Sequence, residues 1–191
     1  VIAGNHHNAI GLLEAPEPYD FMLPERPGTL PGRRIVPLTE VAAAIEAHMA
    51  PHLVRLDRLL GAYKGVPAAH VAGPPPIADE AHIKTYPGNY APPSGLNPEV
   101  TPRSVRLKIY LLQNRLIAAH CKARGIAFLP PPAGGLDAEG FLAPECRKED
   151  PTHGNAVYGR HVLEEIKTFA AGHVPMPGAA KARPVRETEA A

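Results

Sequence analysis

The chain has 191 residues, of which 45% are hydrophobic, and its formal net charge at pH 7 is +1. This length and composition suit one globular domain with a hydrophobic core. The small net charge and the lack of a Lys/Arg cluster interleaved with aromatics argue against a nucleic acid partner. No apolar run approaches the roughly 18 residues of a membrane helix. Two cysteines, Cys121 and Cys146, are too few for a disulfide scaffold, so we expect free thiols.

The first residues of the chain resemble the end of a buried strand. Val1, Ile2 and Ala3 are apolar, and residues 4–8 then form a polar loop after the strand. We therefore expect the sequence to be a fragment cut upstream of Val1. The 24 prolines cluster between periodic segments and mark loops, the first of which is a long surface segment over residues 15–37.

Two strand–helix units follow in the first 125 residues. We predict a helix from Thr39, its N-cap, to about residue 63, bent or split by Pro51. Residues 68–73 are a short apolar strand, and residues 77–100 are a second irregular segment. A helix opened by Thr101 and Pro102 then runs to about residue 124, with a core stripe of Val105, Ile109, Leu112, Leu116 and Ala119.

The last unit comprises a strand over residues 126–129 and a helix over about residues 155–171. Residues 172–191 lack periodicity and are expected to be a disordered tail, which leaves residues 1–171 as the domain. The alternation of strands and helices predicts an α/β fold with a parallel sheet and right-handed crossovers. The long loops leave the C-terminal ends of strands, where such folds place their sites.

Three polar clusters follow strand ends or lie in the loops after them. They are residues 4–8, with Gly4, Asn5 and His6; the loop carrying Asp79, His82 and Tyr86; and the pair Asp150 and His153. In a parallel sheet these clusters would converge on one edge, so we expect a shared site there.

Asp150 and His153 lie three residues apart on a turn before the final helix. Such a carboxylate can hold one ring nitrogen of the histidine while the other takes a proton from a nucleophile. The structural alternative is that Asp150 caps backbone N–H groups and offsets the helix dipole. The amide of Asn5 can stabilise an oxyanion, or Asn5 can simply be a turn residue beside Gly4.

The blocks Asp150-x-x-His153 and Ala3-Gly4-Asn5-His6 resemble two conserved blocks of the SGNH (GDSL-type) hydrolases. The resemblance implies a three-layer α/β/α sandwich of flavodoxin-like type and a serine hydrolase that cleaves esters. It also implies His153 as general base and acid, Asp150 as its orienting group and Asn5 as an oxyanion-hole residue. Gly4 and His6 would line the oxyanion and substrate site. Ala3 and His6 depart from the glycine and acid of the family's asparagine block.

The family's N-terminal Gly-Asp-Ser block has no counterpart in this chain. The only serines are Ser94 and Ser104. Ser94 follows two prolines, and Ser104 lies in the first turns of a predicted helix. Neither position suits a nucleophile at a strand end. We therefore expect about 80–100 upstream residues, carrying two strands and the serine, to complete a domain of ordinary size.

The predicted function is hydrolysis of a small-molecule or carbohydrate ester, without cofactor or metal; the sequence leaves the oligomeric state open. One alternative is a non-catalytic α/β binding module on the same scaffold. Another is a His-based metal hydrolase, in which His6 joins His70, His82 or His153. His48 and His52 also have a spacing that could bind zinc, although Pro51 lies between them.

Overall fold

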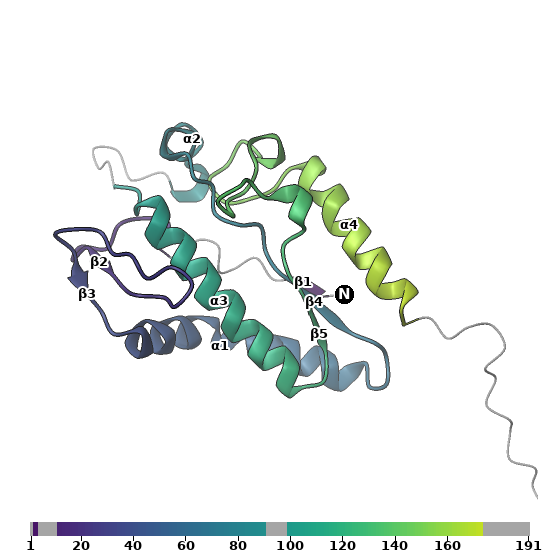
Figure 1. Ribbon diagram of the computed structural model, residues 1–191. Helices are drawn as coiled ribbons and strands as arrows, with labels where there is room; N and C mark the ends of the chain where they lie inside the picture. The colour runs from purple at the N-terminus through teal and green to yellow at the C-terminus, as the bar shows by residue number, and fades with distance from the viewer. Residues whose placement is uncertain (1, 4–10, 91–98, 174–191) are drawn as a thin grey trace, which may run out of the picture.

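The computed structural model describes residues 2–3, 11–90 and 99–173, and it contains short strands and long helices (Figure 1). The strands are β1 (Ile2–Ala3), β2 (Tyr19–Asp20), β3 (Arg34–Ile35), β4 (Ala69–Val71) and β5 (Ala127–Leu129). The α-helices are α1 (Leu38–Ala62), α2 (Glu80–Thr85), α3 (Arg103–Ala123) and α4 (Ala156–Ala171). Three single turns of 3₁₀ helix are η1 (Gly88–Tyr90), η2 (Ala133–Gly135) and η3 (Pro144–Cys146).

The central sheet has the strand order β1-β4-β5, and all its pairings are parallel. His70 is opposite both Ile2 and Phe128 in the register. The strands β2 and β3 form a second, separate parallel pair. The predicted order of strand–helix units and the parallel sheet are therefore present, and the fold is mixed helix and strand, compatible with the α/β class.

Helix α1 follows the predicted apolar stripe. Its buried residues recur at helical spacing: Val41, Ile45, Met49, His52 and Leu56. All of these except His52 belong to a core cluster shared with α3, and His52 contacts His70 of β4. The predicted cap was wrong, because the helix begins at Leu38 after Pro37, and no side chain caps its first N–H groups. The helix also runs unbroken through Pro51.

Helix α3 packs against α1 and β5 and is buried on more than one face (Figure 1). Its predicted stripe is correct at Val105, Ile109 and Leu112, but Ala119 is exposed and Ile117 and Cys121 are buried instead. Its N-terminal half also buries Arg106 and Lys108, because neighbouring loops cover the faces on which these cations lie.

Most of residues 15–37 lie on the surface, as predicted, but the segment also contributes buried side chains to the core. Phe21 and Leu23 are fully buried in the main core, and Asp20 is also completely buried. The Lys108 ammonium donates to the Asp20 carboxylate at 2.6 Å and to the carbonyls of Phe21 and Gly28 at 2.8 and 2.7 Å. These bonds hold the loop against α3 and use all three N–H donors of Lys108.

Residues 77–100, predicted to be irregular, contain α2 and η1. Asp79 caps α2 by accepting the N–H groups of Ala81 and His82 at 2.9 and 3.1 Å. Ile83 of α2 belongs to a second apolar cluster that reaches Tyr158 on α4. This cluster connects α2 to the segment that precedes the final helix.

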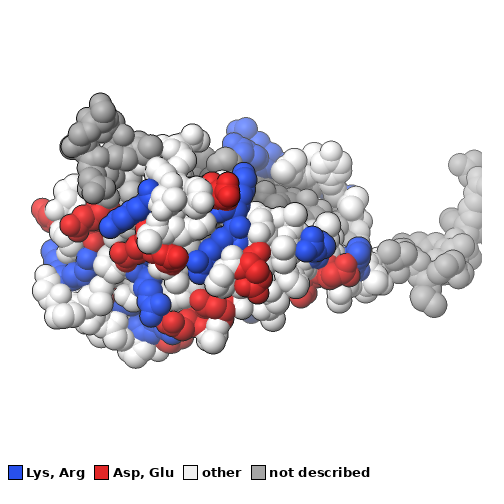
Figure 2. Space-filling view, turned by 90° about the horizontal axis from the view of Figure 1, so that it is seen from above, with Lys and Arg blue, Asp and Glu red and all other residues white. Residues whose placement is uncertain are grey.

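Helix α4 lies on the opposite side of the strands from α3 in the view of Figure 1. Within the described ranges, no helix is long and apolar enough to cross a membrane. The face seen in Figure 2 carries basic and acidic side chains in alternation, without a broad area of one sign. Both cysteines are buried free thiols, as predicted.

Candidate active site

The segment with Asp150 and His153 is a closed loop between η3 and α4. Arg147 and Gly154 form an isolated antiparallel bridge, and Lys148 N–H donates to the His153 carbonyl at 3.1 Å. The Asn155 N–H donates to the Cys146 carbonyl at 2.8 Å. Backbone hydrogen bonds therefore hold the two ends of this loop together.

The Asp150 carboxylate binds the His153 ring and the turn backbone at the same time. Its Oδ2 lies 2.9 Å from His153 Nδ1, and its Oδ1 accepts the N–H groups of Thr152 and His153 at 2.9 and 2.7 Å. Burial raises the pKa of Asp150, but these N–H groups and the imidazole lower it by more, so the pKa lies below its ordinary value. The carboxylate is therefore kept ionised beside the ring.

The second ring nitrogen of His153 is available for chemistry. A carboxylate only accepts hydrogen bonds, so Nδ1 carries the proton and the neutral ring has its lone pair on Nε2. The side chain of His153 is 50% exposed, against 16% for Asp150, and no described residue binds Nε2. This arrangement can accept a proton from a group that approaches from the solvent side.

Asp150 does not cap α4, although its carboxylate does accept two backbone N–H groups of its own turn. Asn155 caps α4, because its Oδ1 accepts the N–H groups of Val157 and Tyr158 at 2.8 and 3.3 Å. Its amide group also donates to the carbonyls of Glu145 and Arg147. Asp150 instead stabilises the turn that carries His153.

Two of the three predicted polar clusters meet. His82 Nε2, on α2, lies 3.0 Å from the Lys148 carbonyl and 3.2 Å from the Asp150 carbonyl. Arg147 also forms an ion pair of 3.5 Å with Asp79, the cap of α2. The predicted convergence of the second and third clusters is therefore present, although the sequence does not indicate that His82 binds carbonyl groups.

The first polar cluster lies outside the described residues. This applies to Gly4, Asn5 and His6, and also to Ser94. The distance between the Asn5 amide and the His153 ring, which would test the shared site, therefore involves an undescribed residue. Their roles stay predictions.

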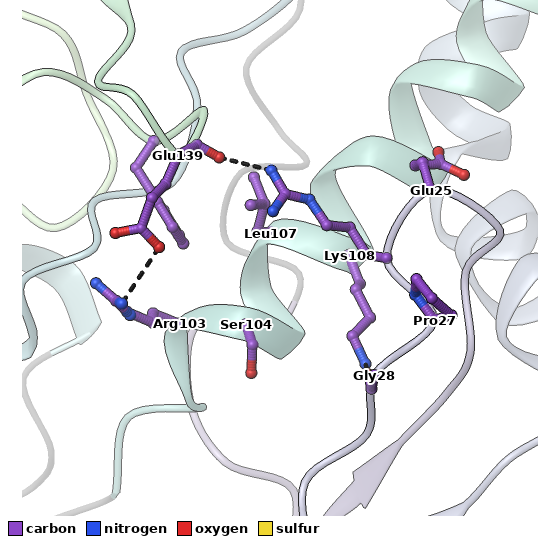
Figure 3. A pocket seen from close by; sticks show the side chains of 10 residues that line it. Glu25, Pro27, Gly28, Arg103, Ser104, Leu107, Lys108 and Glu139 are labelled. Carbon is purple, nitrogen blue, oxygen red and sulfur yellow. Dashed lines mark hydrogen bonds and ion pairs between the residues drawn. The ribbon is translucent and has the colours of Figure 1, made fainter.

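Ser104 lines a pocket to which His153 does not contribute. It belongs to the first turn of α3 and lines a pocket of about 440 Å³ together with Arg26, Arg103 and Glu139 (Figure 3). Arg103 forms an ion pair of 3.2 Å with the Glu139 carboxylate, and Arg26 donates to the Glu139 carbonyl at 2.7 Å. His153 does not line this pocket, so Ser104 does not serve as its partner there.

The buried histidines form a pair rather than a metal centre. His52 Nε2 lies 2.9 Å from His70 Nε2, and the His70 ring stacks on Phe128. His70 is completely buried within β4. His48 instead lines a shallow surface pocket between α1 and the β2–β3 pair. Within residues 2–3, 11–90 and 99–173, no group of three or more His, Cys, Asp or Glu side chains could hold a metal ion.

Comparisons with known proteins place this chain in no family. No family model matches it, and no curated protein matches it. A solved structure from Streptococcus pneumonia, described as a candidate platelet activating factor, is similar over 71% of this chain at 13% identity with a TM-score of 0.47. The chain spans 58% of the length of that structure's chain. Similarity at this level establishes neither a shared fold nor a shared activity.

Proposed function

We propose that this chain carries the acid–base pair of a serine-type ester hydrolase of the SGNH kind, on a three-layer α/β/α scaffold. The observation that supports the proposal is the 2.9 Å contact between Asp150 Oδ2 and His153 Nδ1, with Nε2 bound by no described residue. A histidine held in this tautomer is the general base that acyl transfer from an ester requires. The substrate would be a small-molecule or carbohydrate ester.

In the proposed reaction, His153 Nε2 takes the proton of a serine hydroxyl as its oxygen attacks the ester carbonyl. Asp150 stabilises the imidazolium that forms. His153 then returns the proton to the leaving alcohol, and a water molecule activated by the same ring releases the acid. The Asn5 amide, with Gly4 and His6 beside it, would donate to the oxyanion. The serine would be supplied by residues that precede Val1.

The test is an ester-hydrolysis assay with p-nitrophenyl acetate and an acetylated sugar. A polypeptide that includes the residues preceding Val1 should hydrolyse these esters, whereas the 191-residue chain should show no rate above its His153→Ala variant. In the longer polypeptide, His153→Ala and Asp150→Asn should each lower kcat by about 10²–10⁴-fold, because each removes base catalysis or the correct tautomer.

The matched control is His173→Ala, which removes an exposed histidine at the end of α4 and should leave the rate unchanged. Labelling by a fluorophosphonate probe should locate the serine in the residues preceding Val1. The hydrolase proposal fails if the longer polypeptide hydrolyses no ester, or if His153→Ala leaves its rate unaltered.

A second candidate is a binding module without catalysis. It is favoured by the position of the 440 Å³ pocket, which is lined by Arg26, Arg103 and Ser104 and does not include His153. The discriminating observation is the sequence that precedes Val1. A Gly-Asp-Ser block after an apolar strand there supports the hydrolase, and its absence supports the binding module.

A further inference from the structure

His82 makes an unusual pair of contacts with the loop that carries Asp150 and His153. Its Nε2 lies 3.0 Å from the Lys148 carbonyl oxygen and 3.2 Å from the Asp150 carbonyl oxygen, 66 and 68 residues away in the sequence. Both carbonyl oxygens can only accept hydrogen bonds, so Nε2 must carry a proton that it shares between them. These two hydrogen bonds therefore fix the orientation of the His82 ring.

The contacts of His82 and His153 meet on a single residue. The backbone carbonyl of Asp150 accepts a hydrogen bond from His82, and its side-chain carboxylate accepts one from His153. The Asp150 N–H donates to the Lys148 carbonyl at 2.8 Å, which is the other acceptor of His82. The His82 hydrogen bonds therefore restrain the backbone of the residue whose carboxylate binds His153 Nδ1.

His82 is itself held by neighbouring groups. Its N–H donates to the Asp79 carboxylate at 3.1 Å, and Asp79 also pairs with Arg147 of the loop at 3.5 Å. The His82 ring lies 5.0 Å from the Tyr86 ring, centroid to centroid, at an angle of 52°. Helix α2 therefore presents a fixed donor to a loop that has no regular secondary structure between Lys148 and Thr152.

We propose that His82 is a positioning residue, which holds the Asp150 backbone so that its carboxylate keeps His153 in the Nδ1–H tautomer. The catalytic part of this statement rests on the proposed hydrolase function. His82 does not contact substrate in the proposed reaction; it acts through Asp150. Support for an orienting carboxylate by a further hydrogen bond is a recurring feature of sites in which ring geometry sets reactivity.

The experiment compares His82→Phe, which removes the donor, with His82→Gln, whose side-chain amide can still donate to both carbonyls. Lys84→Ala, an exposed change on the same helix, is the control. Imidazole ¹⁵N NMR of the 191-residue chain reports the tautomer of His153 directly. We expect Nδ1–H in the unmodified chain, a mixture of tautomers in His82→Phe, and Nδ1–H again in His82→Gln and Lys84→Ala.

In the longer polypeptide that hydrolyses esters, His82→Phe should lower kcat about tenfold or more with KM unchanged, and His82→Gln should restore it. An unchanged His153 tautomer in a folded His82→Phe chain overturns the positioning role, even if the ester assay succeeds. Equal loss in His82→Phe and His82→Gln also overturns it. If the His153 tautomer changes in His82→Phe but the protein hydrolyses no ester, the positioning role is supported. The missing ester hydrolysis then contradicts only the hydrolase proposal.

Discussion

At the residue scale, two glycines determine how Tyr158 packs. A Cβ atom on Gly154 would lie 2.6 Å from the Tyr158 ring, and one on Gly135 would lie 2.7 Å from it. Neither glycine has a positive φ, so the requirement is space and not backbone conformation. Tyr158 lies on the first turn of α4, which begins two residues after Gly154. The close approach therefore brings the loop with His153 against the helix.

We expect Gly154→Ala to destabilise the fold by about 1–3 kcal/mol, because the Tyr158 ring must move out of a packed position. Gly159→Ala is the matched control, since no atom lies within 4 Å of the added Cβ and alanine favours the helix interior. It should stabilise by up to about 1 kcal/mol. Urea unfolding of the two variants measures both effects, and equal midpoints would contradict this account.

At the element scale, a buried ion pair joins the 20–30 loop to α3. Lys108 and Asp20 have side chains that are 3% and 0% exposed, and Asp20 also accepts the N–H groups of Phe21 and Leu30. Arg115, on the same helix, pairs with Glu25 of the same loop, but both side chains are more than two-fifths exposed. The two pairs join the same elements and differ in burial.

We expect Lys108→Met to destabilise the fold by about 3–5 kcal/mol, because it leaves the Asp20 carboxylate buried and unpaired. Adding Asp20→Asn should recover part of the loss, since the uncompensated charge is then removed while an amide oxygen can still accept a loop N–H. Arg115→Met should cost less than about 1 kcal/mol. Unfolding free energies measured in urea test the series, and similar costs for Lys108→Met and Arg115→Met would refute the role of burial.

At the scale of the whole molecule, His70 connects the sheet to the helices. It lies on the central strand β4, contacts His52 of α1 and stacks on Phe128 of β5. Burial, with smaller effects from His52 and His120, lowers the pKa of His70 from 6.5 to about 4. The folded chain therefore binds fewer protons than the unfolded chain between these two values, and stability must fall as the pH falls through that range.

Lowering the pH from about 8 to about 5 should reduce the free energy of unfolding by roughly 2 kcal/mol, because the unfolded chain binds a proton at His70 that the folded chain does not. His70→Asn should be less stable at pH 8 but should lose less on acidification, because the residue that takes up the proton on unfolding is gone. His173→Ala, which alters an exposed histidine, should keep the original pH dependence. Urea midpoints at a series of pH values measure the slopes; a His70→Asn slope equal to that of the unmodified chain would argue against this assignment.

The sequence by itself determined the features that depend on short separations. The helical period of apolar residues predicted the buried face of α1, and apolar runs stopped by prolines predicted β4 and β5. The contact between Asp150 and His153 spans three residues, so a local turn is enough to form it. The proton transfer that this pair can support could therefore be inferred from the sequence alone.

Only the tertiary structure decided the contacts between distant segments. Lys108 reaches Asp20 across 88 residues, and His82 reaches Asp150 across 68. A polar residue in a sequence pattern is expected on the surface, so the burial of Lys108 and Asp20 was missed. Such groups can be buried because packing supplies their hydrogen-bond partners, and those partners are set by the arrangement of whole elements and not by local periodicity.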